Sequence, residues 1–598
     1  MYHGTPDEEK VDTVVATTEV EQSQKQAATP AIQGSRLSRF SLPLVAAIIC
    51  LPLLVVVAAF FVGIFSAEQR EVLAHLWDTV IGEYVRHSLV LLVGVGGLVL
   101  VIGVSTAWLT TACRFPGVTW LRWALLLPLA MPAYITAYTY AGMLGFEGTL
   151  QTFLRGAFDW RYGDYWFPEV RSLGGAVIML ALVFFPYVYL ITRAAFIEQS
   201  SAAMEAGRTL GLGPWASFWR IALPMARPAI ATGVTLALME TLADYGTVHY
   251  FGVTTFTTGI FRTWYGMGDQ IGALQLASLL LTFVVVLMVI ERASRAKSRY
   301  HSAGRSSARA KPHQLKGGKA ALAFAACFTP VLFGFILPAL QLGWWSLERY
   351  EIWLQPSFWD LVLNTVTLAV IASVVTVMLA LWLCYGKRRM PGKMVRSSVG
   401  MATLGYAIPG VVIAVGVMVP LAWLDNRLID FSEYAFGWNP GLIFSGTIVA
   451  LIFAYTVRFL SISIQTVDSG LTQIRHSMDE SARILGLSPR EILRRIHFPL
   501  LRTSILTASI LVFVDVLKEL PATLVLRPFN FNTLAVRAHE MASDERLADA
   551  GPPALMIVLA GLIPVILLSR AMGKRKEAEQ AANAAEPKLE DIYEPVRA

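Results

Sequence analysis

The chain has 598 residues, of which 55% are hydrophobic and 15% charged, and its mean hydropathy is +0.56. Soluble domains usually carry about 25% charged residues, so this composition excludes an ordinary soluble enzyme. The net charge is +7, but the basic residues concentrate between long uncharged blocks, and we therefore expect no nucleic-acid partner. The four cysteines show no metal-ligand spacing, so neither a disulfide nor a zinc site is expected.

Twelve apolar blocks are long enough to cross a lipid bilayer, which takes about 20 helical residues. They are too long and too uniformly apolar for the alternating strands of a membrane barrel, so we predict an all-α polytopic membrane protein. The predicted spans are 41–65, 87–112, 119–145, 173–192, 228–250, 272–291, 320–346, 361–384, 397–423, 441–461, 503–525 and 552–569.

The blocks divide the chain into five predicted parts. These are a disordered tail (1–40), a first membrane half (41–292), a basic linker (293–319), a second membrane half (320–570) and a charged tail (571–598). Because Lys and Arg are enriched in cytoplasmic loops, the linker and the run Lys387-Arg388-Arg389 predict cytoplasmic N- and C-termini.

The second half repeats the first at an offset of 275 residues. Arg114-Phe115-Pro116-Gly117 returns as Arg389-Met390-Pro391-Gly392, and Phe256-Thr257-Thr258 returns as Phe531-Asn532-Thr533. Each repeat holds six predicted spans. Because six is even, both copies run in the same direction, and we expect a pseudo-twofold axis along the membrane normal with a pathway where the halves meet.

The loops after the fourth and tenth predicted spans are also repeated. The first contains Glu205-Ala206-Gly207 and continues through Gly211 to Pro224, and the second contains Glu480-Ser481-Ala482 and continues through Gly486 to Pro499. We expect each loop to form a helix, a break at the glycine in a left-handed cap, and a second short helix. Proline is expected to end that second helix just before the next span.

Both loops resemble the EAA loop of ABC importer permeases, in which each permease half docks a short coupling helix on an ATPase subunit. The resemblance implies a MetI-like type I permease fold, a homodimeric ATPase partner, and coupling through the positions that match the motif. These are Glu205, Ala206, Gly211, Pro224, Glu480, Ser481, Gly486 and Pro499. The other interpretation is two interfacial amphipathic helices without a partner.

No phosphate-binding GxxxxGK[ST] motif occurs in the sequence. We therefore expect that this chain is not itself an enzyme and binds no cofactor, and that ATP and Mg²⁺ act on the partner subunit.

Two predicted spans carry charges at related positions. Glu240 and Asp244 correspond to Asp515 and Glu519, and the second pair is joined by Lys518. An i,i+4 pair shares one helix face, and a carboxylate at membrane depth must be paired or face water or a ligand. We expect Glu240, Asp244, Asp515, Glu519 and the nearby Tyr245 to line the substrate path. The alternative is structural: Lys518 pairs with Asp515 or Glu519, and Asp244 and Glu519 lie close enough to the surface to be solvated.

The strings Glu240-Thr241-Leu242-Ala243-Asp244-Tyr245-Gly246 and Lys518-Glu519-Leu520-Pro521-Ala522-Thr523-Leu524 resemble ferric-iron importer permeases. That resemblance implies an inner-membrane protein that receives Fe³⁺ from a periplasmic binding protein. No metal site is assigned, although transient Fe³⁺ at the four carboxylates is a hypothesis. Other solutes (thiamine, a polyamine, phosphate or sulfate) and an ATP-independent secondary transporter remain open. The loop 146–172 is expected either to dock the binding protein or to lie in an interfacial aromatic belt.

Overall fold

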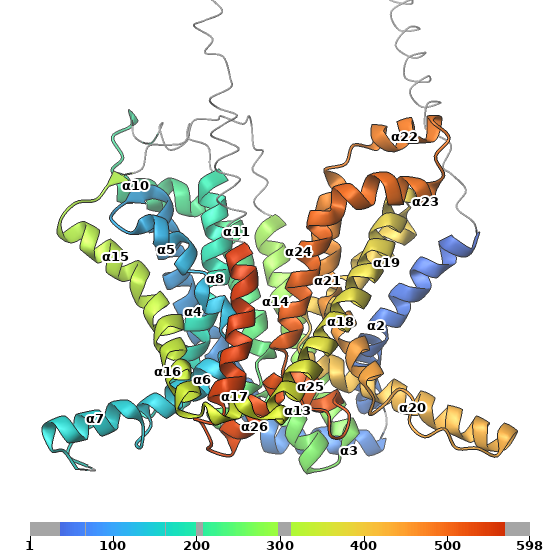
Figure 1. Cartoon of the computed structure of the whole chain (residues 1–598), viewed down its shortest axis with the longest axis horizontal. Helices are drawn as coiled ribbons and strands as arrows, with labels where there is room; N and C mark the ends of the chain where they lie inside the picture. The colour runs from blue at the N-terminus through green and yellow to red at the C-terminus, as the bar shows by residue number, and fades with distance from the viewer. Residues whose placement is uncertain are drawn as a thin grey trace, which may run out of the picture.

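The computed structural model describes residues 36–65, 67–161, 163–198, 207, 209–296, 313–390 and 392–567. The predicted charged tail and all but the end of the predicted first tail lie outside these residues, as does most of the linker. The described part is almost entirely helical, and its elements form two bundles that lean against each other (Figure 1).

The first half contains, in chain order, α2 (Arg36–Phe65), α3 (Ala67–Leu76), η1 (Trp77–Ile81), α4 (Gly82–Ala112), β1 (Cys113–Arg114), α5 (Val118–Ala124), η2 (Leu127–Ala130), α6 (Ala133–Leu144), α7 (Thr149–Phe158), α8 (Leu173–Glu198), α10 (Pro214–Ser217), η3 (Phe218–Ala222), α11 (Leu223–Ala243), α12 (Gly246–Tyr250), α13 (Phe256–Phe261), η4 (Arg262–Gly266) and α14 (Gln270–Ala296).

The second half contains β2 (His313–Gln314), α15 (Gly318–Val331), η5 (Leu332–Ile336), α16 (Leu337–Glu348), α17 (Glu351–Leu354), α18 (Pro356–Arg389), α19 (Lys393–Ala402), η6 (Leu404–Ala407), α20 (Gly410–Phe436), α21 (Ile448–Thr472), α22 (His476–Ile484), α23 (Pro489–Ile492), η7 (Leu493–His497), α24 (Phe498–Leu517), α25 (Pro521–Leu526), α26 (Leu534–Ser543) and a last helix, Gly551–Leu567.

Ten helices within the described ranges are long and apolar enough to cross a membrane, and a bent pair makes an eleventh span. The twelfth predicted span corresponds to the shorter apolar helix Gly551–Leu567. The all-α polytopic fold class is therefore confirmed. The elements α10, α22 and α23 lie on one face, which we call the loop face, and α7, α13 and α26 lie on the opposite face, which we call the far face (Figure 1).

Two of the predicted spans are broken helices. The span 119–145 bends by 91° between Val118–Ala130 and Ala133–Phe158. The residue before a proline avoids the helical region, and Met131, before Pro132, is accordingly extended with ψ 114°. The related span 397–423 breaks in the same way, because Ile408 precedes Pro409 and has ψ 129°. Both predicted spans are therefore present as interrupted helices.

Two further spans end earlier than predicted. The span 228–250 stops at Ala243, and the short helix α12 follows; the span 503–525 stops at Leu517, and α25 follows. These breaks lie at related places in the two halves. Interrupted helices expose backbone groups, and within a bilayer such groups are tolerated only where protein or a water-filled cavity surrounds them.

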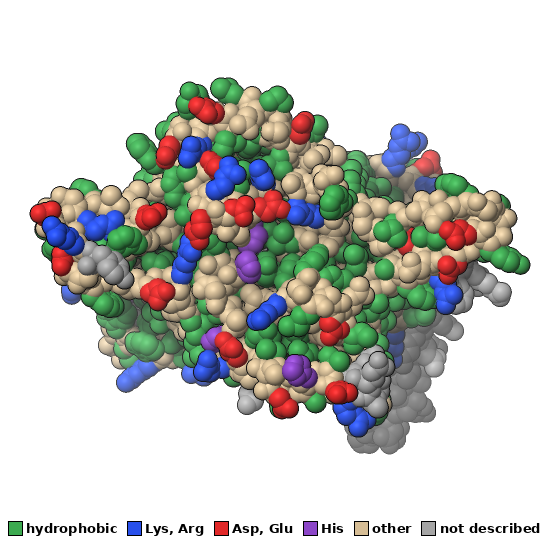
Figure 2. All heavy atoms as spheres, turned by 90° about the horizontal axis from the view of Figure 1, so that it is seen from below, with side chains coloured by type: hydrophobic (Ala, Val, Ile, Leu, Met, Phe, Trp, Pro, Cys, Tyr) green, Lys and Arg blue, Asp and Glu red, His purple; other side chains and the backbone are tan. Residues whose placement is uncertain are grey.

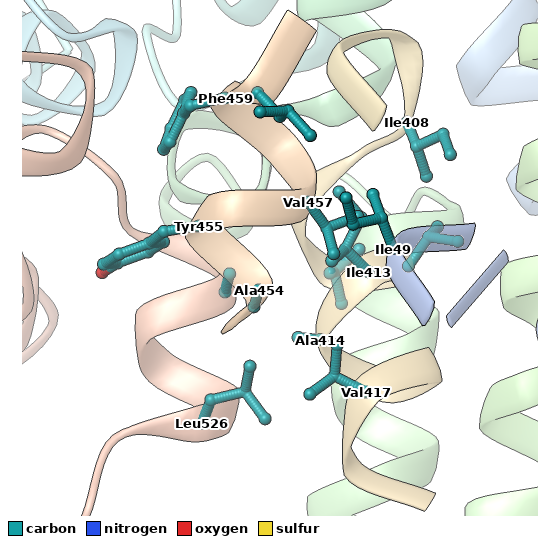
Figure 3. Packing of buried hydrophobic residues seen from close by; sticks show 14 of the residues in the cluster. Ile49, Ile408, Ile413, Ala414, Val417, Ala454, Tyr455, Val457, Phe459 and Leu526 are labelled. Carbon is teal, nitrogen blue, oxygen red and sulfur yellow. The ribbon is translucent and has the colours of Figure 1, made fainter. Parts of the chain in front are cut away.

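The first helix of each half packs on the other half. Buried residues of α2, including Ile49 and Val56, belong to one apolar cluster with α20, α21 and α24, and Figure 3 shows Ile49 beside Ile408 and Ile413. In return, Ala323 and Cys327 of α15 are buried in the cluster formed by α4, α5 and α8. Each half therefore packs its first helix against the other half.

The linker is anchored at its end. His313–Gln314 forms a two-residue parallel pairing with Cys113–Arg114, so the chain that enters the second half is tied to the loop after α4. The four cysteines are free and buried. On the far face, acidic, basic and histidine side chains gather near the centre among hydrophobic residues (Figure 2).

Candidate functional site

A cavity of about 120 Å³ lies between the two halves, where the helices are interrupted. Its wall includes the breaks at Met131–Pro132, at Asp244 and at Lys518. All five residues predicted for the substrate path line this one cavity. They are Glu240, Asp244, Tyr245, Asp515 and Glu519.

The second half neutralises its own carboxylates. Lys518 Nζ lies 2.8 Å from Asp515 Oδ1 within α24 and its cap, and Arg458 Nη1 of α21 donates to Glu519 Oε1 at 3.1 Å. The Glu519 side chain is only 2% exposed. A charge buried to this degree requires a partner, and Arg458 provides it. Of the structural alternative, the pairing of Lys518 with Asp515 is present, whereas the solvation expected for Glu519 is wrong because this side chain is buried.

Asp244 and Glu519 also hold the helix breaks in place. Asp244 accepts backbone N–H bonds from Thr247 and Val248, at 3.0 and 3.2 Å, at the start of α12. Glu519 accepts N–H bonds from Ala522 and Thr523, both at 3.0 Å, at the start of α25. The two carboxylates therefore satisfy backbone donors that would otherwise be unpaired at a helix N-terminus.

Glu240 and Asp515 remain as the carboxylates of the cavity that accept no backbone hydrogen bond in the described structure. Both are half-buried. The Tyr406 side chain of η6 is a hydrogen-bond partner of Glu240. These two acids come from related positions of opposite halves, and they are the carboxylates of the cavity best placed to meet a solute.

The charge of the cavity is not symmetric between the halves. Positions related to Arg458 and Lys518 are occupied in the first half by Val183 and Ala243, and all four residues line the cavity. Four carboxylates thus face two cations, and both cations come from the second half. The cavity keeps a net acidic character, concentrated on the side of Glu240 and Asp244.

Sequence reasoning missed two residues of this cavity. Arg458 is a charged residue inside the predicted span 441–461, so the same argument that identified Lys518 would have found it. Tyr406 gave no such signal, because a tyrosine in an apolar block is common at membrane interfaces. Within the described residues, no group of three or more His, Cys, Asp or Glu side chains is arranged to hold a metal ion.

The duplicated loops lie on the same face, the loop face, with α10 on one side and α22 and α23 on the other (Figure 1). Gly211 and Gly486 adopt the left-handed conformation, with φ +77° and +81°, as predicted. Leu210 and Leu485, at related positions just before these glycines, are each 80% exposed. Apolar side chains this exposed at the tips of two related loops form a matched pair of candidate contact points.

The remaining predicted loop residues are placed only in part. Glu480 and Ser481 are exposed on α22, whereas Glu205 and Ala206 lie outside the described residues. Pro224 and Pro499 do not end the second short helix, which was a wrong prediction. The helix continues through both, as Trp215–Ala243 and Pro489–Leu517. A π-helical turn precedes each proline (Phe218–Ala222 and Leu493–His497), and its wider spacing relieves the clash that proline causes within a helix.

The second loop is fixed to the bundle by a buried ionic cluster. Arg388 Nε lies 2.9 Å from Asp479 Oδ2, and His497 Nε2 lies 2.7 Å from Asp479 Oδ1. Burial opposes the ionisation of Asp479, but the hydrogen bonds from Arg388 and His497 outweigh it and lower the pKa of this carboxyl. The cluster ties α22 to the end of α18 and to η7.

On the far face, an ionic contact joins the two halves. Arg171, which precedes α8, contacts Glu545, which follows α26, through hydrogen bonds of 2.7 and 2.8 Å. Arg171 also donates to the Tyr250 hydroxyl at 2.7 Å. The hydrogen bond from Arg171 lowers the pKa of Glu545.

Two six-span halves with parallel topology, paired loops on one face and a charged cavity between them define a membrane permease built from an internal repeat. The sequence matches the family "binding-protein-dependent transport system inner membrane component" over residues 165–300 and 372–574. The chain belongs to this family, and it is the inner-membrane permease of an ABC importer that works with a periplasmic binding protein and an ATPase.

Three relatives show which members of the family this chain resembles in sequence. It is 26% identical to the Fe(3+)-transport system permease protein FbpB 2 of Haemophilus influenzae, and the match covers 87% of this chain and 96% of that protein. It is 25% identical over 81% of its length to 78% of the putative ferric transport system permease protein FbpB 1 of the same organism. A shorter match, 29% identical, covers 32% of this chain and 83% of the molybdenum transport system permease protein ModB of Escherichia coli.

Proposed function

We propose that this permease imports ferric iron, and that the cavity between the halves is its translocation path. The observation that carries the proposal is the convergence of four carboxylates, two from each half, at interrupted helices around one cavity. Relatives similar to this chain over most of its length are ferric permeases by name. Carboxylate and phenol oxygens are the ligands that hard cations prefer.

Within this proposal, Glu240 and Asp515 contact the metal, whereas Asp244 and Glu519 hold the breaks that shape the path. Tyr245 is a further oxygen-bearing wall residue. A path must bind its ion weakly enough to release it, and the lack of a preformed three-ligand cluster among the described residues is compatible with brief, partly hydrated contacts.

We also propose the orientation and the partners in detail. The loop face is cytoplasmic, as are both termini, because Lys387, Arg388 and Arg389 lie at its end of α18 and positive charge favours the cytoplasm. A homodimeric ATPase, carrying ATP and Mg²⁺, receives the two loops through residues 205–224 and 480–499. Leu210 and Leu485 provide the apolar part of both contacts.

Transport follows alternating access. Closure of the ATPase dimer draws the two loops together, and the bundles rock around the cavity so that the far face opens to the binding protein. The separation of the halves on that face breaks the contact between Arg171 and Glu545. Nucleotide hydrolysis then restores it. The shift depends on contacts that differ between the two states, and this ionic contact is one of them.

The test is uptake of radioactive iron by proteoliposomes that contain the permease, its ATPase and its binding protein. The double variant Glu240→Gln with Asp515→Asn removes two charges with little change of shape. We expect iron uptake to fall at least tenfold while the complex assembles and binds its ATPase normally. Asp430→Asn, an exposed carboxylate of α20 away from the cavity, is the matched control. Unchanged uptake in the double variant would contradict the proposed path.

A second candidate substrate is an oxyanion. Arg458 and Lys518 place two cations on the cavity wall, and one relative is a molybdenum permease by name. However, both cations are occupied by carboxylates at 3.1 and 2.8 Å, which favours the cation. Parallel uptake assays with iron, molybdate and sulfate separate these candidates, because only one of the solutes should accumulate and stimulate the ATPase.

A further inference from the structure

Two histidines from opposite halves meet on the far side of the cavity. His249 belongs to α12 of the first half and His539 to α26 of the second, and their ring centroids are 5.5 Å apart. Both rings also pack against Tyr245, which lines the cavity, at 5.0 and 5.8 Å. The pair therefore spans the junction of the halves next to the proposed path.

The ring nitrogens of this pair are not used elsewhere in the described structure. His87 is hydrogen-bonded to Thr254, and His497 to Asp479, whereas His249 and His539 make ring contacts and no side-chain hydrogen bond within the described residues. His249 is exposed, and His539 is 5% exposed. Burial, with His249 nearby, lowers the pKa of His539 to about 4. This ring is thus neutral near pH 7, the form that binds metals.

The spacing of the rings fits a shared ion. Two imidazoles that bind one tetrahedral zinc ion through bonds of about 2.0–2.1 Å have ring centres roughly 5–6 Å apart. The two rings are inclined to each other at 55°, so they are not stacked face to face.

The repeat provides an internal comparison. The positions related to His249 and His539 are Leu524 of α25 and Trp264 of η4. There the halves are joined instead by the Tyr265 hydroxyl, which donates to the Leu524 and Val525 carbonyl oxygens at 3.3 and 3.0 Å. Imidazoles therefore occur at one of two equivalent junctions, and the packing of the fold does not require them.

We propose that His249 and His539 form a binding site for an imidazole-preferring divalent transition metal such as Zn²⁺, which bridges the two halves on the far face. Water completes the coordination, since no third His, Cys, Asp or Glu side chain among the described residues is grouped with the pair. The bridge reinforces the neighbouring contact between Arg171 and Glu545. A bound ion thus holds the far side of the permease closed and inhibits transport, whatever its cargo is.

The first experiment measures Zn²⁺ binding to the purified full chain in lipid nanodiscs by calorimetry. We expect one inter-half site, and its loss in both His249→Ala and His539→Ala. The control His75→Ala changes an exposed histidine of α3 and keeps the site. Retention of the site in either single variant, or its absence in the wild-type chain, would overturn the proposal.

A spectroscopic measurement distinguishes the loss of one metal ligand from a loss of binding caused by misfolding. Cu²⁺ at substoichiometric amounts should give a paramagnetic resonance spectrum with two coupled imidazole nitrogens, and one such nitrogen in His249→Gln. An unchanged two-nitrogen spectrum in that variant would place the ion elsewhere. The double variant Glu240→Gln with Asp515→Asn should still bind Zn²⁺, so failure of the proposed iron path and failure of this site are distinguishable.

The functional consequence is tested in the complete transporter. Zn²⁺ should slow uptake and ATP hydrolysis in the wild-type complex at least fivefold, and a chelator should reverse the effect. His539→Ala should transport without this sensitivity. Equal inhibition of wild type and His539→Ala would show that Zn²⁺ does not act by bridging the halves.

Discussion

Arg171 of the first half and Glu545 of the second are joined by two hydrogen bonds of 2.7 and 2.8 Å on the far face. Their side chains are 42% and 60% exposed, so solvent screens the pair, and its expected contribution is about 0.2–1 kcal/mol. Arg171→Glu should therefore leave folding intact but shift the resting population toward the outward-open state. Cysteine accessibility at the cavity would report this as faster labelling.

The charge-exchanged variant is the control for this pair. Arg171→Glu combined with Glu545→Arg should restore the wild-type labelling rate, since the ionic contact is rebuilt with reversed sign. If the double variant labels as fast as the single one, the contact does not hold the far face closed.

Arg458 and Glu519 should be far more sensitive. Both side chains are nearly buried, and removal of one partner from a buried pair destabilises a protein by about 3–5 kcal/mol. Glu519→Gln leaves Arg458 without its counterion and weakens the cap of α25, so we expect a clear drop in the thermal unfolding midpoint. Fluorescence-detected unfolding in detergent measures it, and Asp430→Asn should show no drop.

Gly410 provides an independent test of the same pair. A Cβ atom at this position would overlap the Arg458 guanidinium and the Glu519 carboxylate. Gly410→Ala should therefore separate the pair and reduce both stability and uptake without any change of charge. The comparison glycine is Gly343, where a Cβ meets open space. Equal stability of the two alanine variants would contradict the importance of the pair.

Leu210 and Leu485 predict how the permease is held by its ATPase. Leu210→Asp with Leu485→Asp should abolish co-purification of the ATPase, because two exposed apolar contacts are replaced by charges, while the unfolding midpoint of the permease is unchanged. Each single variant should retain partial binding through the other loop. The control Lys393→Asp lies on α19, outside the duplicated loops, and full ATPase binding by the double variant would refute the predicted contact.

His539 predicts a loss of stability in acid. Its folded-state pKa of about 4 lies below the unfolded value of 6.5, so between these values the unfolded chain binds more protons. The stabilisation is complete above pH 6.5 and is lost as pH falls toward 4, by about 3 kcal/mol in total. Unfolding midpoints measured from pH 7.5 to 4.5 should fall less steeply for His539→Gln than for wild type.

The sequence carried the local features of this fold well. Long apolar blocks located the ten membrane-length helices of the described residues, the bent pair and the shorter helix Gly551–Leu567, because the bilayer thickness sets the length of a span. The duplicated loops predicted glycine caps at Gly211 and Gly486, because glycine adopts the left-handed conformation more readily than other residues. Charges in apolar blocks identified residues of the cavity, since the energetic penalty of a charge in a membrane is independent of the fold.

Features that depend on distant packing were not accessible in the same way. The packing of α2 and α15 against the opposite halves could not be predicted, because an apolar helix face is compatible with many packing partners. The continuation of the helices through Pro224 and Pro499 depends on π-turns, which have no simple sequence pattern. The structural role of Asp244 and Glu519 could not be distinguished from the role of Glu240 and Asp515, because each pair has the same i,i+4 spacing.

The placement of both cavity cations in one half has a consequence for how such a transporter can evolve. A permease assembled from two identical chains must have Arg458 and Lys518 counterparts on both sides or on neither. Covalent fusion removes that restriction, because each half is encoded separately and always meets its complement in a one-to-one ratio. One wall of the cavity can then be adjusted by mutation while the other stays fixed, a freedom that a homodimer does not have.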